Sequence, residues 1–345
     1  MRQIFNKEAY GFEANFQVEG IFANNNATSS ANDVYGGAVY YVGGGYKKSK
    51  GLTVSNSIFS NNRVLSHANS TSAKIGGGAV YFSGSTLSIS GSNFIGNTST
   101  SATSDSAESD ALGGALYVNN SSENVSITNS YFAYNSASTT KGATSRGGAI
   151  YLSESFSKEL VLTDTSFEHN SAKKGSAIYQ DLNNQATITI NAKSQNVIFD
   201  NMDTGVESGI YVKYGSTINF NANAEKEIIF KDIILTDDES NHSVLFGINN
   251  SSTDTGTVVF TNTLPNLSEF NLNYGTLHLE DNAAKSTIKH VQVNKTNYGT
   301  LSTQDNQIGT LTMADLLGES GTTLNYAFDL NLNTKTSDIL SITNI

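Results

Sequence analysis

Two short motifs alternate along the first half of the chain, and they constrain the fold more than any other feature of the sequence. The first is Gly-Gly-Ala followed by an aliphatic residue and Tyr, with degenerate copies at Gly175 and Ser208. Its paired glycines are Gly36 and Gly37, Gly77 and Gly78, Gly113 and Gly114, Gly147 and Gly148. The second motif, Phe-x-x-Asn, has its ends at Phe22 and Asn25, Phe59 and Asn62, Phe94 and Asn97, Phe132 and Asn135, Phe167 and Asn170. Self-similarity of this kind indicates a solenoid.

The hydrophobic pattern inside each repeat has a period of two residues. Leu87 and Ile89 precede Phe94 by seven and five positions, and aliphatic pairs beginning at Leu52, Val125 and Leu160 keep the same register. This alternation is typical of strands, and no stretch sustains helical spacing. We therefore predict an all-β fold: a right-handed, single-stranded parallel β-helix in which each coil lies about 4.8 Å above the previous one.

Proline usage supports this prediction. The 345 residues contain one proline, Pro265, whereas ordinary usage of about 5% would give roughly 17. In a solenoid almost every strand is a central strand, where a proline would remove a hydrogen bond of the sheet. A parallel β-helix therefore accounts for the deficit.

Strand alternation assigns each repeated residue to a face. Val39 and Tyr41, with their equivalents in later coils, are predicted to face inward. The Phe residues should stack inside, the Asn amides should bond to one another from coil to coil at a corner, and the glycines should form a bend that needs positive φ or close backbone approach. The remaining face would carry an outward column of tyrosines, and this column is our candidate binding face. Its members are Tyr40, Tyr81, Tyr117, Tyr151, Tyr179 and Tyr211.

Two regions are expected within one continuous solenoid. Residues 1–184 carry the repeats, and residues 185–345 keep alternating segments such as 186–190 and 257–260 without the motifs. The interval between each Asn and the next Gly pair varies in length, which predicts loops inserted at one corner. We expect contact residues in these loops, at 66–74, 98–112 and 138–146.

Composition excludes several classes of protein. The net charge is −11, the arginines are Arg2, Arg63 and Arg146, and there is no cysteine. We therefore expect no nucleic-acid partner, no disulfide framework and no thiolate metal site. Nor do we expect a cofactor or a membrane-spanning helix.

An enzyme is an alternative for this fold class, because parallel β-helices also include pectate lyase-like and polygalacturonase-like enzymes. Chemistry on acidic sugars needs paired carboxylates beside Arg or Lys. The acidic pairs Asp237-Asp238 and Glu280-Asp281 lie in turn-like segments, and Arg63 and Arg146 flank the variable loops. The histidines show no metal-ligand spacing; they are His67, His169, His242, His278 and His290. We therefore predict a non-catalytic protein.

The paired motifs resemble those of the polymorphic outer membrane proteins, which are autotransporters with a repeat-bearing passenger exported through a C-terminal barrel. The matches are the Gly-Gly-Ala copies at Gly36, Gly77, Gly113 and Gly147 and the five Phe-x-x-Asn copies, covering roughly residues 20–180. The closing stretch from Phe328 to Leu340 is similar to autotransporter passengers more generally. The resemblance implies a surface-located or secreted adhesin of a Gram-negative bacterium, reaching the membrane through such a barrel and contacting a protein or glycan on a host or neighbouring cell. A polysaccharide-degrading enzyme and a purely structural spacer stay open as alternatives.

Overall fold

The computed structural model describes most of the chain. The described residues are 3–6, 16–30, 33–43, 51–67, 73–102, 110–140, 144–181, 187–201, 207–213, 215–236, 244–265, 268–293, 298–318 and 322–343. Within them there is one 3-10 turn, η1 (Ala283–Lys285), and no α-helix. No helix in the described part is long and apolar enough to cross a membrane.

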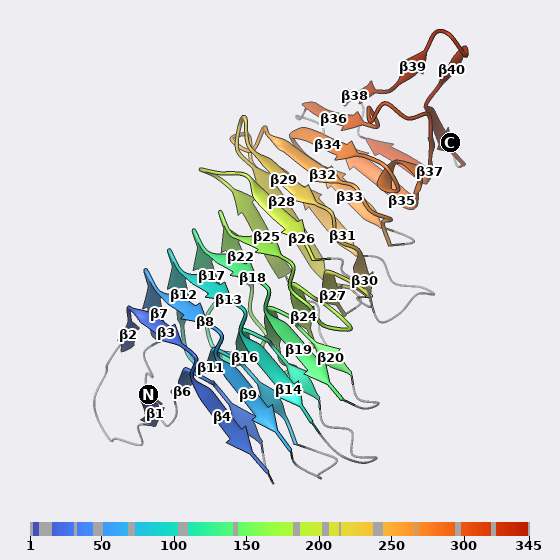
Figure 1. The fold of residues 1–345 in the computed structure, drawn as a ribbon. Coiled ribbons are helices and arrows are strands. Elements are labelled where there is room, and N and C mark those ends of the chain that lie inside the picture. Colours follow the sequence, from blue (N-terminus) through green and yellow to red (C-terminus); the bar gives the residue numbers. More distant parts are fainter. Residues whose placement is uncertain are drawn as a thin grey trace. The chain divides into compact units, whose positions relative to one another are not determined.

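Figure 1 shows the strands of the chain with their labels. By its contacts, the chain divides into two compact units. The first comprises residues 1–161, 165–184 and 200–212, and the second comprises 162–164, 185–199 and 213–345. The predicted continuity of one solenoid through both stays a prediction.

The first unit is a parallel β-helix, as predicted. The strands that follow the Gly-Gly-Ala motif and its degenerate copies are β6 (Val39–Val42), β11 (Val80–Gly84), β16 (Leu116–Ser121), β21 (Ile150–Leu152), β24 (Ile178–Gln180) and β27 (Ile210–Val212), and they stack in this order. Strand β1 (Gln3–Asn6) pairs with β6 at the end of this sheet. A second sheet contains β2 (Phe16–Val18), β7 (Leu52–Ser55), β12 (Leu87–Ser90) and β17 (Val125–Thr128). A third contains β3 (Ile21–Ala23), β8 (Ile58–Ser60), β13 (Asn93–Ile95), β18 (Tyr131–Ala133) and β23 (Ser166–Glu168). Strand β22 (Leu160–Thr163) begins in this unit and ends in the other.

Strand alternation places the core where the sequence predicted it. Val80 and Phe82 of β11 are fully buried, as are Leu116 and Val118 at the same register positions of β16. Leu87 and Ile89 of β12 are buried on the second sheet, while Ser88 and Ser90 between and after them are partly exposed. The inward assignment of the aliphatic face is therefore confirmed.

Phenylalanine side chains form the predicted internal stack. Phe59, Phe94, Phe132 and Phe167 have no exposed surface, and consecutive ring centroids are 4.6–5.0 Å apart. Neighbouring rings lie within 8° of parallel. Phe22 of the first coil continues the stack at 4.8 Å from Phe59. Fixed register makes each ring the neighbour of the equivalent ring one coil away.

The asparagines form a continuous chain of side-chain hydrogen bonds, which we call the Asn ladder. Each amide nitrogen donates to the amide oxygen of the next Asn, at 2.7–2.9 Å from Asn25 to Asn170. That oxygen also accepts the backbone N–H of the preceding Asn, as in Asn62 N to Asn97 Oδ1 at 3.1 Å. The amide nitrogen donates again to a Phe carbonyl, as from Asn97 to Phe59. The predicted ladder is confirmed, and Asn201 extends it by one rung.

The two glycines of each pair have different roles. Gly77 and Gly113 adopt φ of +66° and +60°, a left-handed conformation that glycine adopts without strain. A Cβ on Gly78 would lie 2.1 Å from the carbonyl oxygen of Gly114, so the second glycine permits close stacking of coils. Both predicted reasons for glycine are therefore confirmed, at separate positions.

The segments between each Asn and the next Gly pair contain strands, where the sequence predicted loops. One stacked group is β4 (Asn26–Ser29), β9 (Arg63–Ser66), β14 (Thr98–Ser101) and β19 (Ser136–Thr139). The other is β5 (Val34–Tyr35), β10 (Ile75–Gly76), β15 (Ala111–Leu112) and β20 (Ser145–Arg146). Small apolar side chains such as Ala27, Val34, Val64 and Ile75 pack between the two groups. The parts of the predicted contact loops at 68–72, 103–109 and 141–143 lie outside the described residues.

The second unit also consists of stacked parallel strands. One sheet runs through β25 (Thr187–Ala192), β28 (Thr217–Ala222), β31 (Leu245–Ile248), β33 (Glu269–Leu272), β35 (Thr287–Val293), β37 (Thr310–Gly318) and β41 (Ile339–Ile342). The other runs through β26 (Val197–Asp200), β29 (Glu227–Phe230), β32 (Thr257–Phe260), β34 (Gly275–Leu279), β36 (Tyr298–Ser302) and β38 (Thr323–Ala327). The short strand β30 (Ile234–Thr236) also lies in this unit, and β39 (Leu330–Asn331) and β40 (Thr336–Ser337) form an antiparallel pair. Pro265 lies between β32 and β33, outside every strand.

Candidate functional site

The tyrosines form a column, but it is not a solvent-exposed face. Consecutive ring centroids from Tyr40 to Tyr211 are 4.7–5.7 Å apart. However, only Tyr40 is more than slightly exposed: Tyr81, Tyr117, Tyr151, Tyr179 and Tyr211 are 2–7% exposed. The predicted outward binding face is therefore wrong for these five residues.

In four coils, the residue preceding the Gly-Gly or Gly-Ser pair lies against the tyrosine of the next coil. Tyr35 lies against Tyr81 with ring centroids 4.5 Å apart. Gly76 lies so close to Tyr117 that a Cβ would be 2.3 Å from its ring. Further along, the Arg146 guanidinium lies over the Tyr179 ring and the Lys174 ammonium over the Tyr211 ring, at 5.5 and 4.8 Å. Residues of β5, β10 and β20, together with Lys174, thus cover the column.

Burial also raises the pKa values of tyrosines in the column. It raises the pKa of Tyr81 and Tyr117 far above the ordinary tyrosine value, and neighbouring tyrosines reinforce the effect. Tyr151 has a raised pKa through burial, reinforced by the negative charge of Asp181. These hydroxyls stay neutral at physiological pH, and that of Tyr151 donates a hydrogen bond to Asp181.

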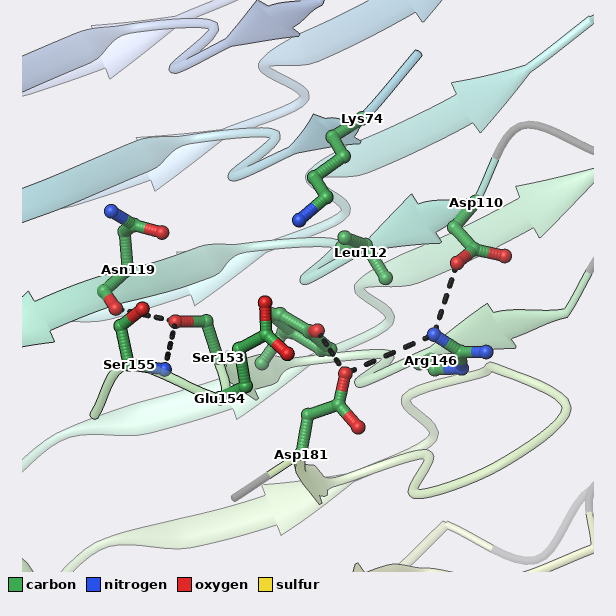
Figure 2. A pocket seen from close by; sticks show the side chains of 10 residues that line it. Lys74, Asp110, Leu112, Asn119, Arg146, Ser153, Glu154, Ser155 and Asp181 are labelled. Atoms are coloured by element: carbon green, nitrogen blue, oxygen red, sulfur yellow. Dashed lines mark hydrogen bonds and ion pairs between the residues drawn. The ribbon is translucent and has the colours of Figure 1, made fainter. Parts of the chain in front are cut away.

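A polar hollow of about 200 Å³ lies where two groups of strands meet in the first unit (Figure 2). Arg146 comes from β20, Tyr151 from β21, and Asp181 directly follows β24. The hollow is lined by Lys74, Asp110, Leu112, Asn119, Arg146, Tyr151, Ser153, Glu154, Ser155 and Asp181. This is the candidate functional site.

An ion-pair network forms one wall of the hollow. Arg146 Nη1 is 3.0 Å from Asp110 Oδ2 and 4.0 Å from Asp181 Oδ2. Tyr151 donates its hydroxyl hydrogen to the same Asp181 oxygen at 2.7 Å. The side chains of Arg146, Asp110 and Asp181 are each about one-quarter to one-third exposed. Arg146, expected beside a variable loop, lies in the two-residue strand β20 and pairs with two carboxylates.

Hydroxyl and amide groups complete the opposite side. Ser153 donates its hydroxyl hydrogen to the Asn119 carbonyl, and Ser155 N donates to Ser153 Oγ at 3.2 Å. These bonds fix the turn that carries Glu154. The hollow thus presents carboxylates, cations and hydroxyls within one small volume, which suits a ligand rich in hydrogen-bonding groups.

The other candidate residues do not gather into a site. Glu280 is 3.5 Å from His278, and Asp281 lies in a turn with φ of +50°. His169 stacks on Tyr134, and His290 lies 3.8 Å from Glu269. Asp237, Asp238 and His242 lie outside the described residues, and Arg63 is exposed at the start of β9. Within the described ranges, no group of three His, Cys, Asp or Glu side chains could hold a metal ion.

Comparisons with protein-family models, with curated proteins and with solved structures find no match to this chain.

Proposed function

We propose that this chain is the passenger part of an exported surface protein of a Gram-negative bacterium, acting as an adhesin. It would contact a protein or glycan on a host cell or neighbouring cell through many weak, non-catalytic contacts. The proposal rests on the resemblance of its paired motifs to autotransporter passengers. One structural observation supports it: residues outside the core repeat in register along the stacked coils.

The outer face of the second sheet illustrates this repetition. Thr53, Ser88 and Ser126 occupy equivalent positions in β7, β12 and β17. Ser55, Ser90 and Thr128 repeat two residues further along, and all six side chains are partly exposed. A surface of short, uncharged side chains repeated at one strand spacing presents the same weak contact many times. Affinity would then come from avidity.

Multivalent display tests this proposal. Beads coated with the purified chain should bind epithelial or bacterial cells, while the monomeric chain should bind the same cells at least about 100-fold more weakly. Protease treatment of the cells would remove a protein receptor, and glycosidase treatment would remove a glycan. Coated beads that bind no better than beads coated with an unrelated β-helix would contradict the adhesin proposal.

A polysaccharide-degrading enzyme is the second candidate, because the hollow places Asp110, Asp181 and Glu154 near Arg146 and Lys74. Carboxylates beside cations are what acid/base chemistry on an acidic sugar requires. However, Asp110 and Asp181 both pair with Arg146, and Asp181 also accepts the Tyr151 hydroxyl. Release of reducing ends from polygalacturonate, abolished by Asp181→Asn, would favour the enzyme over the adhesin.

A further inference from the structure

The hollow contains two charged side chains outside the ion-pair network. Arg146, Asp110, Asp181 and Tyr151 bond to one another and form a fixed wall. Lys74 and Glu154 line the same hollow but form no ion pair with any residue that the structure describes. Figure 2 shows the Lys74 ammonium and the Glu154 carboxylate directed into the space between them. A ligand here would meet one cation and one anion that have no ionic partner in the described part of the chain.

The backbone holds both residues in place. Lys74 N donates to Asp33 Oδ1 at 2.8 Å, which anchors the residue ahead of β10. Glu154 sits between Ser153 and Ser155, whose hydrogen bonds fix the turn. The two charges therefore project from ordered backbone into a preformed space, which lowers the entropic cost of binding.

The size and lining of the hollow narrow the chemical class of the ligand. A volume of about 200 Å³ accommodates roughly one sugar ring or a group of similar size. Most small-molecule sites are larger and mainly apolar, whereas eight of the ten residues around this hollow are Lys, Arg, Asp, Glu, Asn or Ser, the others being Leu112 and Tyr151. A ligand with several hydroxyls matches this lining better than an apolar one.

The two charges specify the ligand further. A carboxylate on the ligand would pair with the Lys74 ammonium, and ligand hydroxyls would donate to the Glu154 carboxylate. A purely cationic ligand would be repelled by Lys74, an anion without hydroxyls would be repelled by Glu154, and a neutral sugar would leave Lys74 without a counter-charge. We propose that this hollow is a subsite for a carboxylate-bearing sugar, such as a uronic acid unit within a cell-surface glycan. This inference rests on the proposed adhesin function, because it names the ligand class.

Saturation-transfer NMR on the full chain tests the subsite directly. The probes are galacturonate and galactose. In galacturonate C6 is a carboxylate carbon, and in galactose it is the carbon of a hydroxymethyl group. Galacturonate should receive saturation from the protein and galactose much less. Lys74→Gln and Glu154→Gln should each weaken galacturonate binding about tenfold, since charge-assisted hydrogen bonds are lost. Lys158→Gln, an exposed lysine outside the hollow, should leave binding unchanged.

Two results would overturn the subsite. One is equal saturation of galactose and galacturonate, and the other is galacturonate binding that survives Lys74→Gln in a folded protein with unchanged circular dichroism. Cell binding of coated beads, measured with the same variants, separates the two proposals. If beads bind cells but galacturonate does not bind the chain, the subsite is wrong and the adhesin proposal stands. If galacturonate binds the chain but the coated beads do not bind cells, the adhesin proposal is wrong and the subsite stands.

Discussion

The amide nitrogen of Asn97 donates to the amide oxygen of Asn135 at 2.9 Å, across 38 residues of sequence. The same Asn135 oxygen accepts the backbone N–H of Asn97, and the Asn135 nitrogen donates to the Phe94 carbonyl and to Asn170. One buried side chain thus satisfies polar groups in three successive coils. The Asn ladder therefore supports the turn that follows each phenylalanine.

Removing one rung should destabilise the first unit strongly. Asn135→Ala deprives the buried Asn97 N–H, the Asn97 amide and the Phe94 carbonyl of their partner, and each such loss costs about 1–3 kcal/mol. We expect the free energy of unfolding to fall by about 3 kcal/mol or more in urea titrations. Asn93→Ala removes an exposed, outward amide one strand away and should change stability by less than about 0.5 kcal/mol. Equal effects of the two substitutions would contradict a structural role for the ladder.

The second glycine of each pair should tolerate no side chain. A Cβ on Gly114 would lie 2.1 Å from the Gly148 carbonyl oxygen and 2.6 Å from the Ser136 backbone. Because backbone on both sides must move, we expect Gly114→Ala to reduce stability by about 3 kcal/mol. Gly309→Ala is the matched control, since its Cβ would meet nothing nearer than 3.6 Å. A Gly114→Ala protein whose melting temperature equals that of the native chain would show that the coils are not this closely stacked.

Gln180 is a weak point in the core of the first unit. It is fully buried in β24, and neither polar atom of its side chain has a hydrogen-bond partner among the residues that the structure describes. The neighbouring strand carries Leu152 at the same register position. We expect Gln180→Leu to raise the free energy of unfolding by about 1–3 kcal/mol, because an unsatisfied buried amide is replaced by an apolar group. A lower denaturation midpoint for Gln180→Leu would mean that the amide is satisfied in solution.

Acid should weaken the second unit through Asp164. Burial opposes ionisation of this carboxylate, but hydrogen bonds from Ser194 and from the backbone N–H groups of Lys193 and Gln195 outweigh that effect and lower its pKa. A lowered folded-state pKa gives stability that is fully present above the unfolded pKa of about 3.9 and is lost as pH falls toward the folded value. The stability difference between the native chain and Asp164→Asn should therefore be largest near pH 7 and shrink below about pH 4. A difference that is constant from pH 7 to pH 2 would exclude this role.

Most of the scaffold could be predicted because identical residues recur at identical spacing. Phe94 and Phe132 stack because register places like residues one above another, so their repetition in the sequence reveals their contact. Asn201 could not be predicted from the Phe-x-x-Asn motif because it follows Phe199 by two residues, not three. It nevertheless completes the Asn ladder.

The cover of the tyrosine column could not be predicted in the same way. The position before each Gly pair is Tyr35, Gly76, Leu112, Arg146 or Lys174, so no repeated letter marks it. Strand alternation alone places the Tyr81 side chain on the face opposite the core, which is correct for β11. Alternation does not reveal that further strands cover this face. A signal was present in the apolar residues Val64 of β9 and Ile75 of β10, which pack between the two groups of strands.

The hollow also could not be predicted from the sequence. Asp110, Arg146 and Asp181 lie about one coil apart along the chain, in segments of different length and composition. Their proximity depends on β15 and β20 pairing in register, with Leu112 beside Arg146. No repeated motif contains these three residues, whereas the core residues recur within the same motif in every coil.

Engineered disulfides test the stacking of coils most directly, because the native chain contains no cysteine. Ser88 and Ser126 are register partners on adjacent strands, so their Cα atoms should be about 4.8 Å apart, within the range that a disulfide spans. Thr53 and Ser126 are separated by one intervening strand, at about twice that distance. Mild oxidation should close the 88–126 pair within one molecule and leave the 53–126 pair reduced. Failure of the 88–126 pair to close, or equal closure of both pairs, would contradict a chain that advances by one strand spacing per coil.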